Sequence, residues 1–80
     1  MRVKVERVNS KLGKAVIDMN EMDYGWLEIL GCYDLEEDDI FEGNFELGEE
    51  KIYNHTQKVE MDVFIEDYGC TLKNAISAIY

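Results

Sequence analysis

The stretch KVEMDVFIE, residues 58–66, alternates apolar and charged side chains along almost its whole length. Every second residue from Val59 to Ile65 is apolar, and the residues between them are charged except for Phe64. Successive side chains of a β-strand point to opposite faces, so this period of two predicts a strand with one buried face. Phe64 is the exception on the polar face, where it either covers a barrel end or lies at a contact.

Outward from this stretch, the same period recurs in shorter segments. IFEGNFEL, residues 40–47, places two phenylalanines and a leucine on one face and carboxylates on the other. Gly43 interrupts it, and a glycine inside a strand is common where a sheet bends sharply, as a small closed barrel requires. Further strands are predicted at residues 2–8, 14–19, 26–30 and 51–53, with a loop over 20–25 and a turn over 48–50.

The last ten residues change period. Thr71 is a residue type that caps helices, and the positions that follow it have the spacing of one helical face: Leu72, Ala75, Ile76, Ile79 and Tyr80. A helix this short is not stable alone, so it is expected to dock its apolar stripe on the sheet. A final strand is the alternative.

Short, curved strands with little helix predict an all-β barrel. The run LEEDDIFEG, residues 35–43, resembles the acidic turn, apolar residue and x-Gly entry into a strand found in many OB-fold and SH3-like barrels. The element order is similar to that of the OB-fold, with the helix between the third and fourth strands reduced to one turn over 35–38, capped by Asp34. Eighty residues make one domain, residues 1–80. The resemblance implies a five- or six-stranded OB-like barrel with a short C-terminal helix, or alternatively an SH3-like barrel.

The charge balance is strongly acidic. Eighteen Asp and Glu against eight Lys and Arg give a formal net charge of −10. This disfavours nucleic acid and anionic membranes as partners, because proteins that bind them concentrate Lys and Arg on one face. The first 14 residues are the exception, with five Lys and Arg against Glu6 alone. This basic hairpin is expected either to lie against acidic neighbours or to form a small basic patch.

Residues typical of catalytic and metal sites are sparse. Cys32, Cys70 and His55 are the soft ligands, and no Cys-x-x-Cys pair occurs, so zinc is not indicated. The acidic run from residue 34 has Asp39 where a calcium loop needs glycine. No glycine-rich phosphate loop is present. We therefore predict no enzyme activity, no metal and no cofactor.

The first residues, MRVKVERV, form a charged strand-like start without the apolar stretch of a secretory signal. No apolar run approaches the ~20 residues that span a bilayer. We therefore expect a cytoplasmic protein that has free thiols and no membrane contact.

Aromatic residues form one candidate binding group. Tyr24 and Trp26 flank Gly25 at the start of the third predicted strand, and Tyr33 follows that strand. In an OB-like barrel this is near the ligand face, where exposed aromatics stack bases or sugars. The alternative is that Trp26 belongs to the core.

Acidic residues form the other group. The run from 33 to 50 holds nine carboxylates and no base, and regularly spaced carboxylates imitate the phosphates of nucleic acid. The imitating set would be Asp34, Glu36, Glu37, Asp38, Asp39, Glu42, Glu46, Glu49 and Glu50. The alternative is an ordinary solvated turn leading into a strand.

The sequence thus predicts a small non-enzymatic interaction module whose partner is another protein, in an oligomeric state left open. The alternatives are an acidic mimic that blocks a basic nucleic-acid-binding protein, and an OB-type binder of single-stranded nucleic acid or oligosaccharide. The residues predicted to bind the partner are Tyr24, Trp26, Tyr33, Asp38, Asp39 and Glu42.

Overall fold

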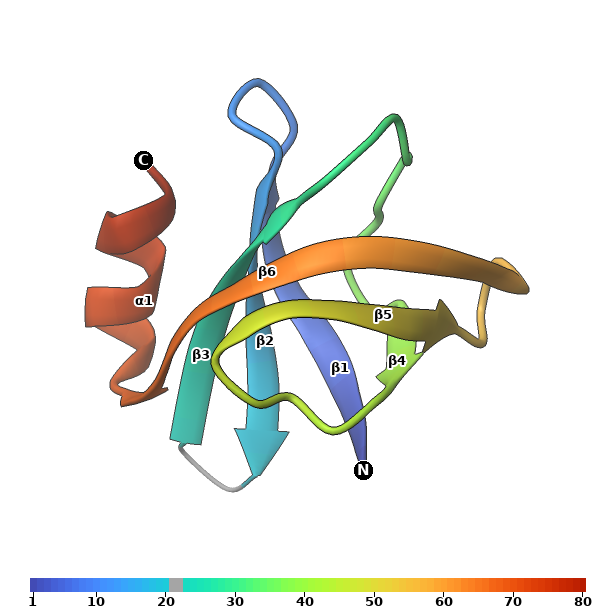
Figure 1. The fold of residues 1–80 in the computed structure, drawn as a ribbon. Helices are drawn as coiled ribbons and strands as arrows, with labels where there is room; N and C mark the ends of the chain where they lie inside the picture. The colour runs from blue at the N-terminus through green and yellow to red at the C-terminus, as the bar shows by residue number, and fades with distance from the viewer. Residues whose placement is uncertain (21–22) are drawn as a thin grey trace.

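The computed structural model describes residues 1–20 and 23–80, in which six antiparallel strands close into a barrel and one helix follows (Figure 1). The elements are β1 (Arg2–Asn9), β2 (Lys14–Asn20), β3 (Asp23–Ile29), β4 (Ile40–Glu42), β5 (Gly48–Asn54), β6 (Val59–Cys70) and α1 (Leu72–Ile79). Their order around the barrel is β1-β2-β3-β6-β5-β4, and β4 pairs with β1 to close it. The predicted all-β barrel with a short C-terminal helix is confirmed. It has one strand more than the five of an OB barrel.

The barrel interior is filled by alternate residues of its strands. In β6, Met61, Val63 and Ile65 are buried while Phe64 is exposed, as the period of two predicted. The rest of this core comes from the other strands and the segment after β4: Val3, Val5, Ala15, Ile17, Leu27, Phe41, Phe45 and Ile52. Burial of such a side chain contributes about 1.5–3 kcal/mol relative to exposure, so this core supplies most of the drive to fold.

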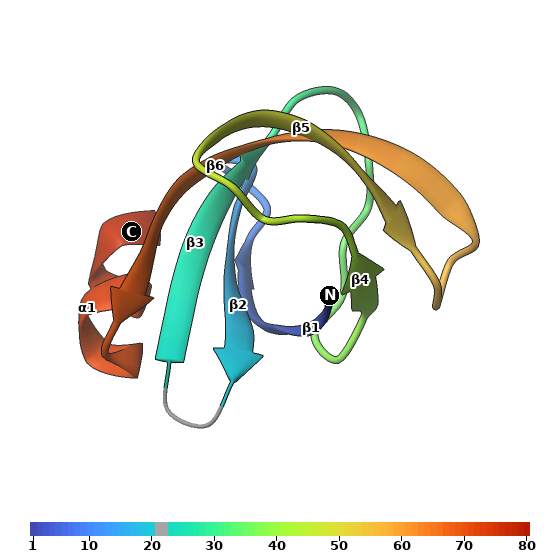
Figure 2. The same cartoon turned by 60° about the horizontal axis from the view of Figure 1, so that its bottom comes forward.

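A second, smaller core lies outside the barrel under α1, which packs beside β3 (Figure 2). Ala75 and Ile79 are buried there against Val16, an outward-facing residue of β2. The Thr71 side chain accepts a hydrogen bond from the Asn74 N–H (3.2 Å) and caps the helix. The predicted helix and its cap are confirmed, and the alternative final strand does not form. Among the described residues, no helix has the length and apolar character needed to cross a membrane.

Several predictions about the middle of the chain are wrong. The helical turn predicted over 35–38 is instead a turn in which the Asp39 N–H donates to the Glu36 carbonyl (3.2 Å) and Asp38 has φ 75°. The strand predicted over 40–47 ends at Glu42, and the turn predicted over 48–50 belongs to β5. Of the loop predicted over 20–25, residues 21–22 lie outside the described residues, and β3 already begins at Asp23.

The early end of β4 has its cause in the side chain of Glu50. Its Oε2 accepts from the Asn44 N–H (2.6 Å) and its Oε1 from the Glu46 N–H (3.3 Å). Because these two backbone N–H groups are already bonded to the carboxylate, they need no hydrogen bond to a neighbouring strand. Gly43 makes the approach possible, because a Cβ there would lie 2.5 Å from Glu50 Oε2. As a result Leu47, predicted to be buried, is exposed.

Candidate functional site

The residues predicted to bind a partner fall in separate places. In chain order they are Tyr24, Trp26, Tyr33, Asp38, Asp39 and Glu42. The first two pack against the core under α1, the third lies at one end of the barrel, and the three acids lie along β1. No single surface gathers them all, so each place is described by itself.

The acidic residues lie beside the basic strand β1. The Val5 N–H donates to the Asp39 carbonyl (2.9 Å), and the Asp38 N–H donates to the Val5 carbonyl (2.8 Å). Ion pairs across this seam are Arg2–Glu42, Lys4–Asp38 and Arg7–Glu37, with N···O distances of 3.2, 3.8 and 3.8 Å. Each exposed pair is worth at most about 1 kcal/mol. Their effect is on charge: the basic hairpin lies against acidic neighbours, the first of the two arrangements expected.

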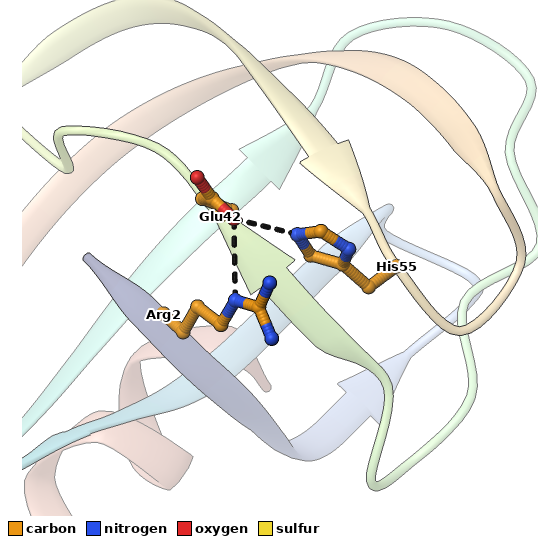
Figure 3. Close-up of polar contacts among 3 residues, drawn as sticks. All are labelled: Arg2, Glu42 and His55. Atoms are coloured by element: carbon orange, nitrogen blue, oxygen red, sulfur yellow. Dashed lines mark hydrogen bonds and ion pairs between the residues drawn. The ribbon is translucent and has the colours of Figure 1, made fainter.

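Glu42 accepts hydrogen bonds from two side chains at the surface (Figure 3). Its Oε1 accepts from His55 Nε2 at 2.6 Å and from Arg2 Nε at 3.2 Å. The His55 ring also meets the Tyr53 ring edge-on, with centroids 4.8 Å apart. The hydrogen bond from His55, and then that from Arg2, lower the pKa of Glu42. Glu42 therefore remains an anion whose charge is compensated by donors of the same chain.

Asp39 does not lie on the surface. It is 2% exposed, and its Oδ2 accepts from the Glu36 N–H (3.2 Å), Asn54 Nδ2 (3.0 Å) and Gln57 Nε2 (2.6 Å). Asn54 is fully buried. The carboxylate thus ties the segment before β4 to the end of β5 and the turn after it. The prediction of Asp39 as an exposed binding residue is wrong, because a buried amide and a glutamine recruit it inward.

Tyr24 and Trp26 are half-buried, and both pack against the core under α1. The Lys14 ammonium lies 5.3 Å from the centroid of the Trp26 ring. Gly25 between them admits no side chain, because a Cβ would lie 2.7 Å from the Asp67 carbonyl oxygen. Trp26 is therefore neither inside the barrel nor on an open stacking platform.

A concave site is present at the barrel end that holds Tyr33. This pocket, of about 460 Å³, is lined by residues of the β1–β2 loop and of the segment that follows β3. Val8, Ile29, Tyr33 and Leu35 line it and pack against the barrel core; we call these four residues the barrel-end groove. Leu12, in the loop beside it, is 50% exposed. Of the groove, the sequence suggested only Tyr33, because its other residues appear as ordinary strand and loop residues.

Within residues 1–20 and 23–80, no three His, Cys, Asp or Glu side chains gather as metal ligands. Cys32 and Cys70 are both free thiols. Burial, followed by the charge of Asp67, raises the pKa of Cys70, which makes it a weaker nucleophile at neutral pH.

Comparisons with known proteins provide no family for this chain. It matches no protein-family model, and neither the curated proteins nor the solved structures contain a significant match to it.

Proposed function

We propose that the protein is a small non-enzymatic interaction module of the cytoplasm that binds another protein at the barrel-end groove. The observation that carries this proposal is a concavity open to solvent in which the four apolar residues of the barrel-end groove lie beside the polar Ser10 and Asp34. The exposed Leu12 lies on the loop beside it. A few apolar anchors inserted into such pockets supply most of the binding energy of many interfaces. The two free thiols fit a reducing compartment.

The arrangement of the acids favours this function over nucleic-acid mimicry. Glu37, Asp38 and Glu42 are paired with the cations of β1, Asp39 is buried, and Glu50 is bonded to the loop after β4. Five of the nine carboxylates are thus used within the chain. A phosphate mimic needs its charges exposed and uncompensated to attract a basic partner.

The closed antiparallel barrel supports the OB-like assignment, and with it a binder of single-stranded nucleic acid or oligosaccharide as a further candidate. This candidate is less favoured, because α1 packs against the cluster that contains Tyr24 and Trp26. The net charge of −10 also repels a phosphate backbone.

The proposal is tested by affinity capture from a lysate of the source cells, with washes at low and high salt and identification of the bound proteins. Leu12→Asp places a charge beside the groove. Tyr68→Asp is the matched control, because Tyr68 is similarly exposed (48%) and lies on β6 outside the groove. We expect a partner that survives the high-salt wash with the wild type and the control and is lost with Leu12→Asp. Capture of a basic nucleic-acid-binding protein at low salt alone, unaffected by Leu12→Asp, would favour the mimic.

A further inference from the structure

Phe64 stands on the outer face of β6 between two carboxylates. Its neighbours in the strand, Val63 and Ile65, fill the barrel, whereas Phe64 is 39% exposed. Glu28 of β3 is its direct cross-strand partner on one side and Glu49 of β5 on the other. The three residues therefore form one row across the sheet, with an aromatic ring at its centre.

A second exposed apolar residue lies at the same end of the strands. Gly48 pairs with Ile65, one row along the sheet from Glu49 and Phe64, and Leu47 directly precedes Gly48 in the chain. Leu47 is 58% exposed. We call Glu28, Leu47, Glu49 and Phe64 the Phe64 patch.

In the part of the chain that the structure describes, neither Glu28 nor Glu49 forms an ion pair. On the adjacent outward-facing row, by contrast, Lys51 pairs with Asp62 (3.7 Å). Lys14 is the cross-strand partner of Glu28 on the other side, but its ammonium lies over the Trp26 ring.

We propose that the Phe64 patch docks an arginine side chain of a partner protein. The planar guanidinium stacks on the Phe64 ring while its N–H groups donate to Glu28 and Glu49, and the aliphatic stem packs on Leu47. The two glutamates, one strand to either side of Phe64, are about 9–10 Å apart at their Cα atoms, and their flexible side chains can turn toward a cation between them. The Lys14–Trp26 pair shows a cation over an aromatic ring on the same outer face.

This inference rests on residues other than the barrel-end groove, and it is tested separately. The ¹⁵N-labelled protein is titrated at low ionic strength with the peptide acetyl-Gly-Arg-Gly-amide, and amide shifts are followed by NMR. The same peptide with citrulline in place of arginine keeps the shape and removes the charge. We expect saturable shifts centred on Glu28, Glu49 and Phe64 with the arginine peptide, and none there with citrulline.

Variants then separate the patch from the general acidity of the surface. Phe64→Thr keeps a strand-forming residue and should weaken binding about two- to five-fold, the range of an exposed cation–π contact. Glu28→Gln with Glu49→Gln should abolish saturable binding. Glu60→Gln, an exposed acid of the same strand outside the patch, and Leu12→Asp, beside the groove, should bind as the wild type does.

Four results would overturn the proposal. They are shifts spread evenly over all acidic residues or absent altogether, equal binding of the citrulline peptide, and wild-type affinity in a Phe64→Thr variant whose dispersed spectrum shows that it is folded.

Discussion

At the scale of single residues, the neighbours Asp38 and Asp39 show how identical side chains acquire different roles. Asp38 occupies a turn and pairs with Lys4 at the surface. Asp39 is buried and accepts hydrogen bonds from Asn54 and Gln57. The neighbouring sequence does not distinguish the two residues, because the donors that hold Asp39 in the interior, Asn54 and Gln57, lie 15 and 18 residues away. The acidic run could be recognised from the sequence, but not which of its acids face solvent.

Asp39→Ala should lower the free energy of unfolding by about 2–3 kcal/mol, because it leaves the buried Asn54 amide without its carboxylate partner. Glu36→Ala is the matched control: its side chain is exposed, and the contact with Asp39 uses its backbone N–H. The control should stay within about 0.5 kcal/mol of the wild type. Urea unfolding of both variants measures the difference. Equal stability of the two variants would show that the network around Asp39 is not structural.

The hydrogen bonds of Glu42 should make the free energy of unfolding depend on pH. Hydrogen bonds from His55 and Arg2 lower its pKa below the ordinary value of 4.5 in the folded state. The unfolded chain therefore binds the proton more tightly, and the stabilisation is present above pH 4.5 and is lost as the pH falls through the folded pKa. The stability difference between the wild type and Glu42→Gln should shrink as the pH falls below 4.5. A gap that stays constant or widens on acidification, in urea unfolding at each pH, would contradict this.

The two donors to Glu42 should contribute unequally to its pKa, which NMR titration of the Glu42 carboxyl measures. His55→Gln should raise the pKa of Glu42 more than Arg2→Gln does, because the hydrogen bond from His55 is the larger cause of the shift. The reverse order would mean that Arg2 dominates.

At the scale of elements, a strand or helix could be predicted when the residues that determine it are neighbours in the sequence. The period of two in residues 58–66 and the cap of α1 depend only on neighbouring residues. The strand and the helix predicted from them are confirmed. The end of β4 was wrong, because it depends on the Glu50 carboxylate reaching back to Asn44 and Glu46. The groove was missed for a similar reason, since it forms only where the β1–β2 loop meets the segment after β3.

The docking of α1 predicts how the second core responds to a cavity. Ile79→Ala should cost about 2–5 kcal/mol of unfolding free energy, because Ile79 is fully buried under the helix. The fluorescence of Trp26, which packs against the same core, should shift to the red as water gains access. Lys73→Ala, at an exposed position of α1, should change the free energy of unfolding by no more than about 0.5 kcal/mol. It should leave the emission maximum of Trp26 where it is in the wild type. An Ile79→Ala variant as stable as this control would show that α1 contributes little to the fold.

At the scale of the whole molecule, the net charge of −10 says less about function than its distribution does. The cations of β1 lie along the acidic segment and compensate part of it. The Phe64 patch and the barrel-end groove are two further surfaces, and neither includes the paired acids along β1. Composition alone predicted an acidic protein, but barrel closure between β1 and β4 decides where the negative charge is left free.

We propose that the protein binds its partner by apolar contact at the barrel-end groove and not by imitation of phosphates. The most direct test of this claim is the salt dependence of affinity for the captured partner, measured by isothermal titration calorimetry. Between about 0.05 M and 0.2 M salt we expect Kd to rise by less than about tenfold, because screening weakens charged contacts and leaves apolar ones unchanged. A loss of about 10³-fold or more, as in proteins that make many phosphate contacts, would contradict the claim and make the acidic segment the functional surface.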